Sequence, residues 1–199
     1  IELTLEYVDA MPLAPDERAR LIALRDRALL YTLADTGLRV SEACHLTRGH
    51  LDWEEGRAVV LGKGGAEAVV RFSGRALARL RQYVAARAAL DGATGRPLPS
   101  LALFARHDDG AGTRILPIEA QTARKIVESV VVAALGPEYR GQITPHTYRH
   151  YFVTVVLRAS GGNLRLAQEL ARHKNIAITQ RYAHLSDDDL DRGYSEIFN

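Results

Sequence analysis

The chain of 199 residues contains 47% apolar and 25% charged residues, which allows a substantial core in one large domain or two small ones. Its formal net charge is only +2, so any surface that binds nucleic acid would have to be local. The single cysteine, Cys44, excludes an internal disulfide and a cysteine-rich zinc site. The sequence shows neither an apolar run of transmembrane length nor a signal peptide, and we expect a cytoplasmic protein.

The first part of the chain predicts two helices separated by a tight turn. Apolar residues recur at helical spacing up to Tyr31, and Gly37 is a typical residue for the C-terminal end of a helix. A short second helix is predicted from Val40 to Leu46, with Cys44 as a buried thiol and Arg39 at the helix start. Backbone N–H groups point out of a helix start, so this position favours an anion.

The middle of the chain predicts a β-hairpin, a helix and two loops. The segment Arg57–Phe72 alternates in polarity and is rich in valine, with glycines around Lys63 at its turn. Ser73 is a favourable N-cap for the helix that follows. Asp91–Ser100 lacks periodicity and contains Gly, Pro and Ser, so it is predicted to be a loop, as is His107–Thr113.

Helices are predicted for most of the last third of the chain. One runs from Pro117 to about Leu135, and another starts near Pro145, because proline is favoured in a first helical turn. In the second of these, His146 and Arg149 project roughly 60° apart, at the edge of the apolar face, where one phosphate could meet both. That apolar face is predicted to consist of Tyr148, Phe152, Val155, Val156 and Ala159.

Further helices are predicted toward the C-terminus. Asn163 is the expected N-cap of a helix that ends near Arg172. A short helix from about Asn175 has Tyr182 near its end, and Ser186 begins a segment that resembles a capping box.

An ordered set of reactive residues is the most informative feature. Arg39 is followed by the pair His146 and Arg149, one helical turn apart, then by His173 and, nine positions later, Tyr182. Two guanidiniums can neutralise a pentacoordinate phosphorus, imidazoles can hold or move protons, and a phenol can be a nucleophile. No single member is specific, but the ordered set matches the requirements for cleaving a DNA phosphodiester through a phosphotyrosine.

Four segments resemble the tyrosine recombinases, the phage-integrase and Xer-like family. Thr36–Glu42 and His146–His150 look like its two signature boxes, Gly62–Gly65 resembles its hairpin lysine, and Ala171–His184 resembles its closing box. The likeness covers nearly the whole chain. All six positions at which the family keeps a catalytic residue are filled: Arg39, Lys63, His146, Arg149, His173 and Tyr182.

The resemblance implies a role for each of these residues. Tyr182 is the nucleophile that forms a 3′-phosphotyrosine and releases a 5′-hydroxyl, while the two arginines clamp the charge of the transition state. Lys63 is the general acid for the leaving oxygen. His146 is a proton acceptor or phosphate ligand, and His173 donates a hydrogen bond to the phosphate.

Two other residues of the boxes are expected to support the site. The resemblance suggests that Glu42 orients Arg39, although a solvated ion pair one helical turn apart is an equally simple interpretation. His150 is expected to support the site or pack near it. His146 and His150 have the spacing of zinc ligands, but the glutamate of a zinc-protease helix is replaced by Thr147. No metal and no cofactor is predicted.

The closing box departs from the family pattern at one point. The family has a Leu-Gly pair before the histidine, and this chain has Ala171 and Arg172. A glycine there allows close backbone approach, so Arg172 either crowds the site or adds a phosphate contact. We expect Arg172 and Lys174 to contact DNA.

The expected fold is α+β and mainly α, a helical catalytic domain with a small antiparallel β-sheet, as in DNA breaking-rejoining enzymes. Residues 1–199 are predicted to be this catalytic domain alone. The chain starts at Ile1 without the family's N-terminal DNA-clamping domain, so we expect a piece of a longer protein.

The function implied is metal-independent, site-specific recombination of double-stranded DNA by a nucleoid-associated enzyme. The resemblance further implies a homotetramer on DNA in which C-terminal segments are exchanged. Asp187–Asn199 is the candidate segment, or it packs on its own chain. Two alternatives remain at this stage: a type IB topoisomerase-like relaxing enzyme, which would not join strands between duplexes, and a catalytically silent DNA-binding regulator, which would form no covalent adduct.

Overall fold

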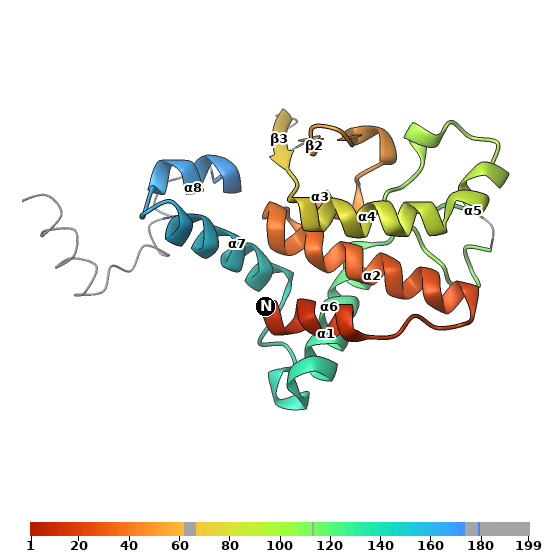
Figure 1. Ribbon diagram of the computed structural model, residues 1–199, viewed down its shortest axis with the longest axis horizontal. Coiled ribbons are helices and arrows are strands. Elements are labelled where there is room, and N and C mark those ends of the chain that lie inside the picture. Colours follow the sequence, from red (N-terminus) through yellow and green to blue (C-terminus); the bar gives the residue numbers. More distant parts are fainter. Residues whose placement is uncertain (62–66, 113, 174–178, 180–199) are drawn as a thin grey trace, which may run out of the picture. The chain divides into compact units, whose positions relative to one another are not determined.

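The computed structural model describes residues 1–61, 67–112, 114–173 and 179 (Figure 1). It divides into two compact units, Ile1–Phe152 and Val153–Asn199. The described elements, in chain order, are α1 Glu2–Ala10, α2 Glu17–Thr36, α3 Val40–Cys44, η1 Arg48–His50, β1 Leu51–Asp52, β2 Arg57–Leu61, β3 Glu67–Arg71, α4 Gly74–Ala86, α5 Ala88–Ala93, η2 Leu98–Ser100, α6 Ala120–Leu135, η3 Pro137–Tyr139, α7 Pro145–Ala159 and α8 Leu164–Ala171.

The first unit is organised around α2, which packs lengthwise against α4 (Figure 1). Helices α1 and α6 pack against each other and against α2, and their apolar faces join α2 and α4 in one core. Leu29, Leu30 and Leu33 of α2 are fully buried in it, as are Leu80 and Tyr83 of α4. Burial of this kind stabilises a fold by about 1.5–3 kcal/mol for each large apolar side chain.

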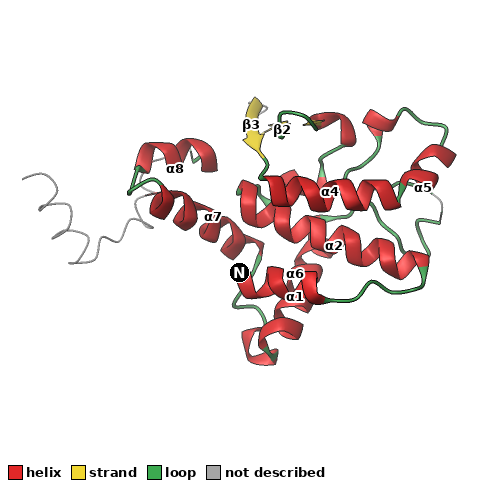
Figure 2. Cartoon of the chain, viewed as in Figure 1, coloured by secondary structure: helices red, strands yellow, loops and turns green. Residues whose placement is uncertain are grey.

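A small antiparallel sheet with the strand order β1-β2-β3 completes this unit (Figure 2). In β2 and β3, Val59 is paired with Val69 and Ala58 with Val70. Ala58, Val60 and Val70 face the core, because alternate side chains of a strand point to one side. The predicted hairpin and the mainly helical fold with a small antiparallel sheet are confirmed. The hairpin turn, residues 62–66, lies outside the described residues.

The loop predicted at Asp91–Ser100 is wrong at both ends, because Asp91 belongs to α5 and Leu98–Ser100 forms η2. Asp91 is 1% exposed, and its carboxylate pairs with Arg87, 2.8 Å away, and with Arg48, 2.5 Å away. A buried carboxylate needs such partners, and its two ion pairs stabilise the helical turn that contains Asp91. The predicted start of the next helix at Pro117 is also wrong, since α6 begins at Ala120 and Pro117 forms an isolated bridge with Ala105.

Helix α1, which the sequence patterns did not reveal, supports the first turns of α7. Tyr148 of α7 is fully buried, and its hydroxyl forms a 2.7 Å hydrogen bond with Thr4 of α1. Burial raises the pKa of Tyr148 to about 12. Tyr151 donates a hydrogen bond to the Glu2 carboxylate. The helix that carries His146 and Arg149 is therefore fixed to the N-terminal helix.

The predicted apolar face of α7 is only partly correct. Tyr148 is buried as expected, but Val155 is 43% exposed. The buried positions after Tyr148 are Arg149, Val153 and Leu157, which recur every four residues on one side of the helix. The buried face of α7 is rotated relative to the predicted face because Arg149 points inward, and a pattern of apolar residues does not include a charged side chain.

The second unit contains α8, which is capped at both ends. The side chain of Asn163 accepts a 3.0 Å hydrogen bond from the Leu166 N–H, so the predicted N-cap is confirmed. At the other end, Arg172 has a φ of 57° and is the only non-glycine residue with positive φ in the described part of the chain. The N–H of His173 donates to the Gln168 carbonyl at 3.0 Å, which closes a Schellman-type helix end.

Gly37 ends α2, as the sequence predicts, and two constraints require glycine there. Its φ of 60° lies in the left-handed region, where a side chain costs about 1–2 kcal/mol. A Cβ at this position would also overlap the ring of Phe152, with its Cε1 only 2.9 Å away. Backbone conformation and packing therefore exclude larger residues independently.

We expect Gly37→Ala to lower the free energy of unfolding by about 2–4 kcal/mol, the sum of backbone strain and overpacking. Gly95→Ala is the matched control, because Gly95 has a φ of 65° and no atom lies within 4 Å of the place that its Cβ would take. It should cost only about 1 kcal/mol. Urea denaturation of both variants measures the difference, and equal losses would show that Phe152 does not constrain the turn.

Arg172→Gly should unfold at higher denaturant concentration than Arg172→Ala. Both variants remove the same long side chain, but only glycine relieves the left-handed conformation, so the gap is expected to be about 1 kcal/mol. Circular dichroism during urea denaturation provides the measurement. If the alanine variant is as stable as the glycine variant, this helix end carries no backbone strain.

Candidate active site

The first box forms a turn that presents Arg39 to solvent. The Thr36 hydroxyl donates to the Thr32 carbonyl at 2.6 Å and accepts from the Leu38 N–H at 3.2 Å, which fixes the end of α2. Arg39 then takes the N-cap position of α3 with an extended backbone. Leu38 is fully buried, so the turn is anchored on both sides of Gly37.

Glu42 holds Arg39 at two points. Its carboxylate accepts one hydrogen bond from the Arg39 backbone N–H at 2.9 Å and another from the Arg39 guanidinium at 2.8 Å. The Glu42 side chain is 8% exposed and that of Arg39 is 49% exposed. This is not a freely solvated pair, because a nearly buried carboxylate fixes a guanidinium whose other side faces solvent. The geometry suits the orienting role expected for Glu42.

The second box is joined to the first through Arg149. This residue is 5% exposed, and its guanidinium donates a hydrogen bond to the carbonyl of Gly37, 112 positions earlier. A buried guanidinium needs such acceptors, and the last carbonyls of a helix need donors. The bond meets both needs and brings the two boxes together.

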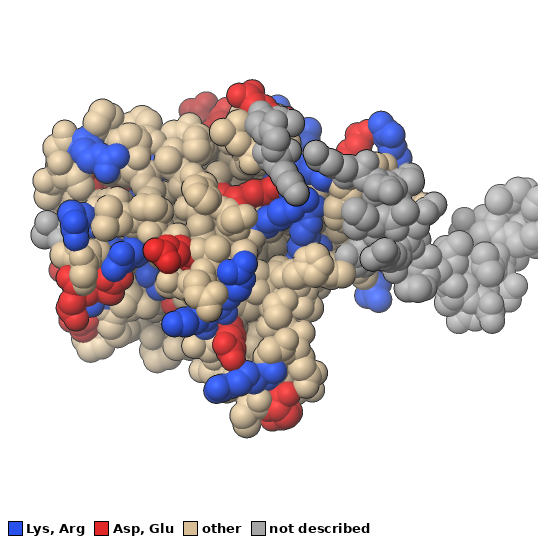
Figure 3. All heavy atoms as spheres, turned by 180° about the vertical axis from the view of Figure 1, so that it is seen from behind, with Lys and Arg blue, Asp and Glu red and all other residues tan. Residues whose placement is uncertain are grey.

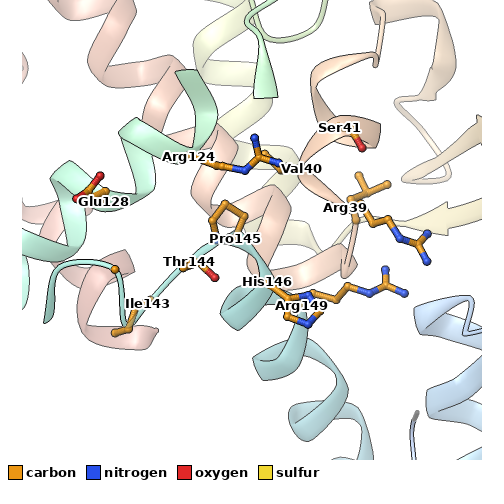
Figure 4. A pocket seen from close by; sticks show the side chains of 12 residues that line it. Arg39, Val40, Ser41, Arg124, Glu128, Ile143, Thr144, Pro145, His146 and Arg149 are labelled. Carbon is orange, nitrogen blue, oxygen red and sulfur yellow. The ribbon is translucent and has the colours of Figure 1, made fainter. Parts of the chain in front are cut away.

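Arg39, His146 and Arg149 line one cavity of about 560 Å³ in the first unit. Figure 4 shows the guanidinium groups of Arg39 and Arg149 directed to the same side, with His146 beside Arg149. The three residues come from the start of α3 and the first turns of α7, as the sequence predicts. The remaining lining residues are Leu38, Val40, Ser41, Arg124, Glu128, Gly141, Ile143, Thr144 and Pro145.

His150 lies against His146. The two ring centroids are 4.2 Å apart and the rings are nearly perpendicular, an edge-to-face arrangement. Desolvation, together with the charges of His146 and Arg149, lowers the pKa of His150. An uncharged His150 packed against His146 fits the supporting role expected for it. Among the described residues, no group of three His, Cys, Asp or Glu side chains is placed to hold a metal ion.

The cavity also contains residues that the motif pattern did not identify. Arg124 and Glu128 of α6 contribute to its wall, and Figure 4 shows the Arg124 side chain near Val40. The two residues are four positions apart and adjoin the buried positions Ala123 and Val127. A helical projection would have placed them at the border of the buried face, but nothing in that pattern relates α6 to the boxes.

Cys44 lies in α3 and is 3% exposed, which confirms the predicted buried thiol. Burial raises its pKa to about 11, so the thiol stays protonated and unreactive at neutral pH.

Figure 3 shows basic and acidic side chains interspersed on the face drawn there, consistent with the small net charge. No helix in the described ranges has the length and apolar composition needed to cross a bilayer.

The other site residues predicted from the sequence lie either in the second unit or outside the described residues. His173 and Arg172 belong to the second unit. The Nδ1 atom of His173 is 2.9 Å from the Thr179 hydroxyl, and the Gln168 side chain donates to the His173 carbonyl at 3.1 Å. Lys63, Lys174 and Tyr182 lie outside the described residues, as do the helix predicted after Ser186 and, apart from Thr179, the helix predicted from about Asn175.

The cavity is suited to a phosphodiester. Two guanidiniums on one side can each donate a pair of hydrogen bonds to phosphate oxygens. The imidazole of His146 adds a group that can hold or move a proton. Arg149 is buried and held in place, so its charge is preorganised and needs little rearrangement as negative charge develops.

Comparison with known proteins gives close relatives. Tyrosine recombinase XerC of Pelobacter propionicus is 34% identical over 196 residues, which cover 98% of this chain and 58% of the relative. Tyrosine recombinase XerD of Chlorobaculum tepidum is 33% identical over 187 residues, covering 92% of this chain and 57% of the relative. The chain thus spans little more than half the length of these relatives.

Solved structures share the fold. The crystal structure of XerA recombinase matches 95% of this chain and 66% of its own with a TM-score of 0.67 and 29% identity. XerH bound to its difH substrate in a pre-cleavage complex matches 100% of this chain and 52% of its own with a TM-score of 0.74. At 21% identity, the second likeness concerns the fold alone. A model of the phage integrase family matches residues 3–189, and the chain belongs to that family.

Proposed function

We propose that this chain is the catalytic part of a site-specific DNA recombinase that cleaves and rejoins strands through a 3′-phosphotyrosine. The observation that carries the proposal is the cavity at which Arg39, His146 and Arg149 meet. The relatives named tyrosine recombinases XerC and XerD support it, and so do the folds of recombinases solved with DNA. Both favour recombination over the topoisomerase-like and silent-regulator alternatives.

The proposed reaction is an in-line displacement at phosphorus. The Tyr182 oxygen bonds to the scissile phosphorus while the bond to the 5′-oxygen breaks, and the phenolic proton passes to His146 or to solvent. Lys63 donates a proton to the leaving oxygen. Arg39 and Arg149 neutralise the non-bridging oxygens. Because the phosphotyrosine keeps the bond energy, a 5′-hydroxyl from another strand can reverse the step without a nucleotide cofactor or a metal.

The described tyrosines near the second box are engaged in structural bonds, which favours Tyr182 as nucleophile. Tyr148 is fully buried against Thr4. Tyr151 donates to Glu2, and burial raises its pKa. A phenol with a raised pKa and a carboxylate partner is a poor nucleophile toward an anionic phosphate.

The proposal extends to the partners of the whole protein. Double-stranded DNA is the substrate, bound by a homotetramer that exchanges its C-terminal segments, in the nucleoid of the cytoplasm. Arg172 and Lys174 add contacts to the DNA backbone beside His173. In the whole protein, an N-terminal clamping domain would add phosphate contacts to those of this catalytic domain of residues 1–199, so the present chain alone is expected to bind DNA weakly. Binding by the present chain alone should therefore weaken steeply as salt rises, because phosphate contacts release counterions.

Tyr182→Phe should abolish covalent protein–DNA adducts on a nicked suicide substrate while leaving DNA affinity nearly unchanged, because only the attacking oxygen is removed. Tyr139→Phe is the matched control, since Tyr139 is 40% exposed and is not a member of the ordered set of reactive residues. Adducts are counted on denaturing gels in the presence of EDTA, which the two-arginine mechanism tolerates. A phenylalanine variant that still forms adducts would refute the assignment. Adducts without strand joining between two duplexes would favour the topoisomerase-like alternative.

A further inference from the structure

His173 is held by hydrogen bonds on three sides within the second unit. Its backbone N–H donates to the Gln168 carbonyl at 3.0 Å, and its own carbonyl accepts from the Gln168 side-chain amide at 3.1 Å. Its Nδ1 lies 2.9 Å from the hydroxyl of Thr179, a residue that is fully buried. The backbone hydrogen bonds fix the position of the His173 main chain, and the Thr179 hydroxyl fixes the orientation of the imidazole ring.

The contact with Thr179 also bears on which ring nitrogen carries the proton. A neutral imidazole has one N–H donor and one acceptor nitrogen. If the Thr179 hydroxyl donates to Nδ1, the proton resides on Nε2, and an uncharged His173 can donate a hydrogen bond to a phosphate oxygen. If Thr179 instead accepts from Nδ1–H, then Nε2 is an acceptor and would repel an anion until the ring is protonated.

We propose that Thr179 is a positioning residue that donates its hydroxyl proton to Nδ1 and so keeps His173 in the Nε2–H tautomer. The inference rests on the proposed function, in which His173 is a hydrogen-bond donor to the scissile phosphate. Thr179 has no contact with the substrate in this account and acts through the imidazole. Its role is to let an uncharged His173 serve as a hydrogen-bond donor.

Gln168 also holds His173 in place, through a hydrogen bond from its side-chain amide. It lies in the last turn of α8, and its side chain closes on the residue that follows the left-handed Arg172. Its amide thereby stabilises the sharp exit of the chain from the helix, so the path that leads into His173 is fixed before any substrate binds. Preorganisation of this kind reduces the rearrangement needed in the transition state.

The tautomer can be measured without DNA. In the ¹⁵N-labelled chain, long-range ¹H–¹⁵N spectra at pH 8 should show Nε2 of His173 protonated and Nδ1 as a hydrogen-bonded acceptor. Thr179→Ser should keep that pattern, and Thr179→Val, which has nearly the same shape but no hydroxyl, should lose the hydrogen-bond shift of Nδ1. A protonated Nδ1 in the parent protein would overturn the proposal, whatever the outcome of any activity assay.

Cleavage of a suicide substrate by the same variants provides the functional test. Thr179→Val should reduce the single-turnover rate about tenfold at pH 8, the usual effect of one hydrogen bond, with DNA affinity unchanged. The loss should shrink in acid, because an imidazolium carries protons on both nitrogens and needs no tautomer control. Thr179→Ser should restore most of the rate.

A double-mutant cycle separates positioning from packing. Added to His173→Ala, Thr179→Val should cause no further loss, since its effect passes through the imidazole. An equal loss in both backgrounds, or a serine variant as impaired as the valine variant, would overturn the proposal. If the parent chain does not cleave, or His173→Ala cleaves as fast as the parent, the proposed function fails, and the spectra still decide the tautomer.

Discussion

The hydrogen bond from the buried Arg149 guanidinium to the Gly37 carbonyl is the interaction on which the arrangement of the site depends. It joins segments 112 positions apart and places a positive charge at the end of a helix, where carbonyl groups lack partners within the helix. A cation there is favourable, and Gly37 has the left-handed conformation that ends α2. Because the same turn leads two residues later to Arg39, this bond brings the segment that carries Arg39 next to Arg149.

The chemistry follows from this constraint. Arg39 is half-exposed and held by Glu42, whereas Arg149 is almost fully buried and held by backbone. The two charges are therefore fixed in different ways, one by a carboxylate and one by a carbonyl, and both face the cavity that His146 borders. Two positive charges held close together repel each other, so the arrangement favours an anion between them. A phosphodiester is the anion that the family relationship supports.

Local signals in the sequence predicted the parts of the fold that local physics determines. Gly37 as a helix end and Ser73 as a helix start were correct, because each depends on its own backbone and nearest neighbours. The loop predicted at Asp91 is wrong because one of the partners of its buried carboxylate, Arg48, lies 43 positions earlier in the chain. The inward orientation of Arg149 depends on a partner that is also distant in the sequence, and the contact of Thr179 with His173, although only six residues apart, follows from no local pattern. The ordered motif predicts the reactive residues, whereas the hydrogen bonds that orient Arg39 and Arg149 are seen only in the structure.

In the proposed reaction, two guanidiniums neutralise the two non-bridging oxygens of one phosphate. Cleavage of a substrate with a methylphosphonate at the scissile position tests it most directly, because one negative oxygen is then replaced by an uncharged methyl group. On ordinary DNA, Arg39→Ala should cleave about 10²–10³-fold more slowly than the parent. On the methylphosphonate, the variant should come within about tenfold of the parent, since one arginine then suffices for the remaining charge. An equal deficit on both substrates would contradict the account.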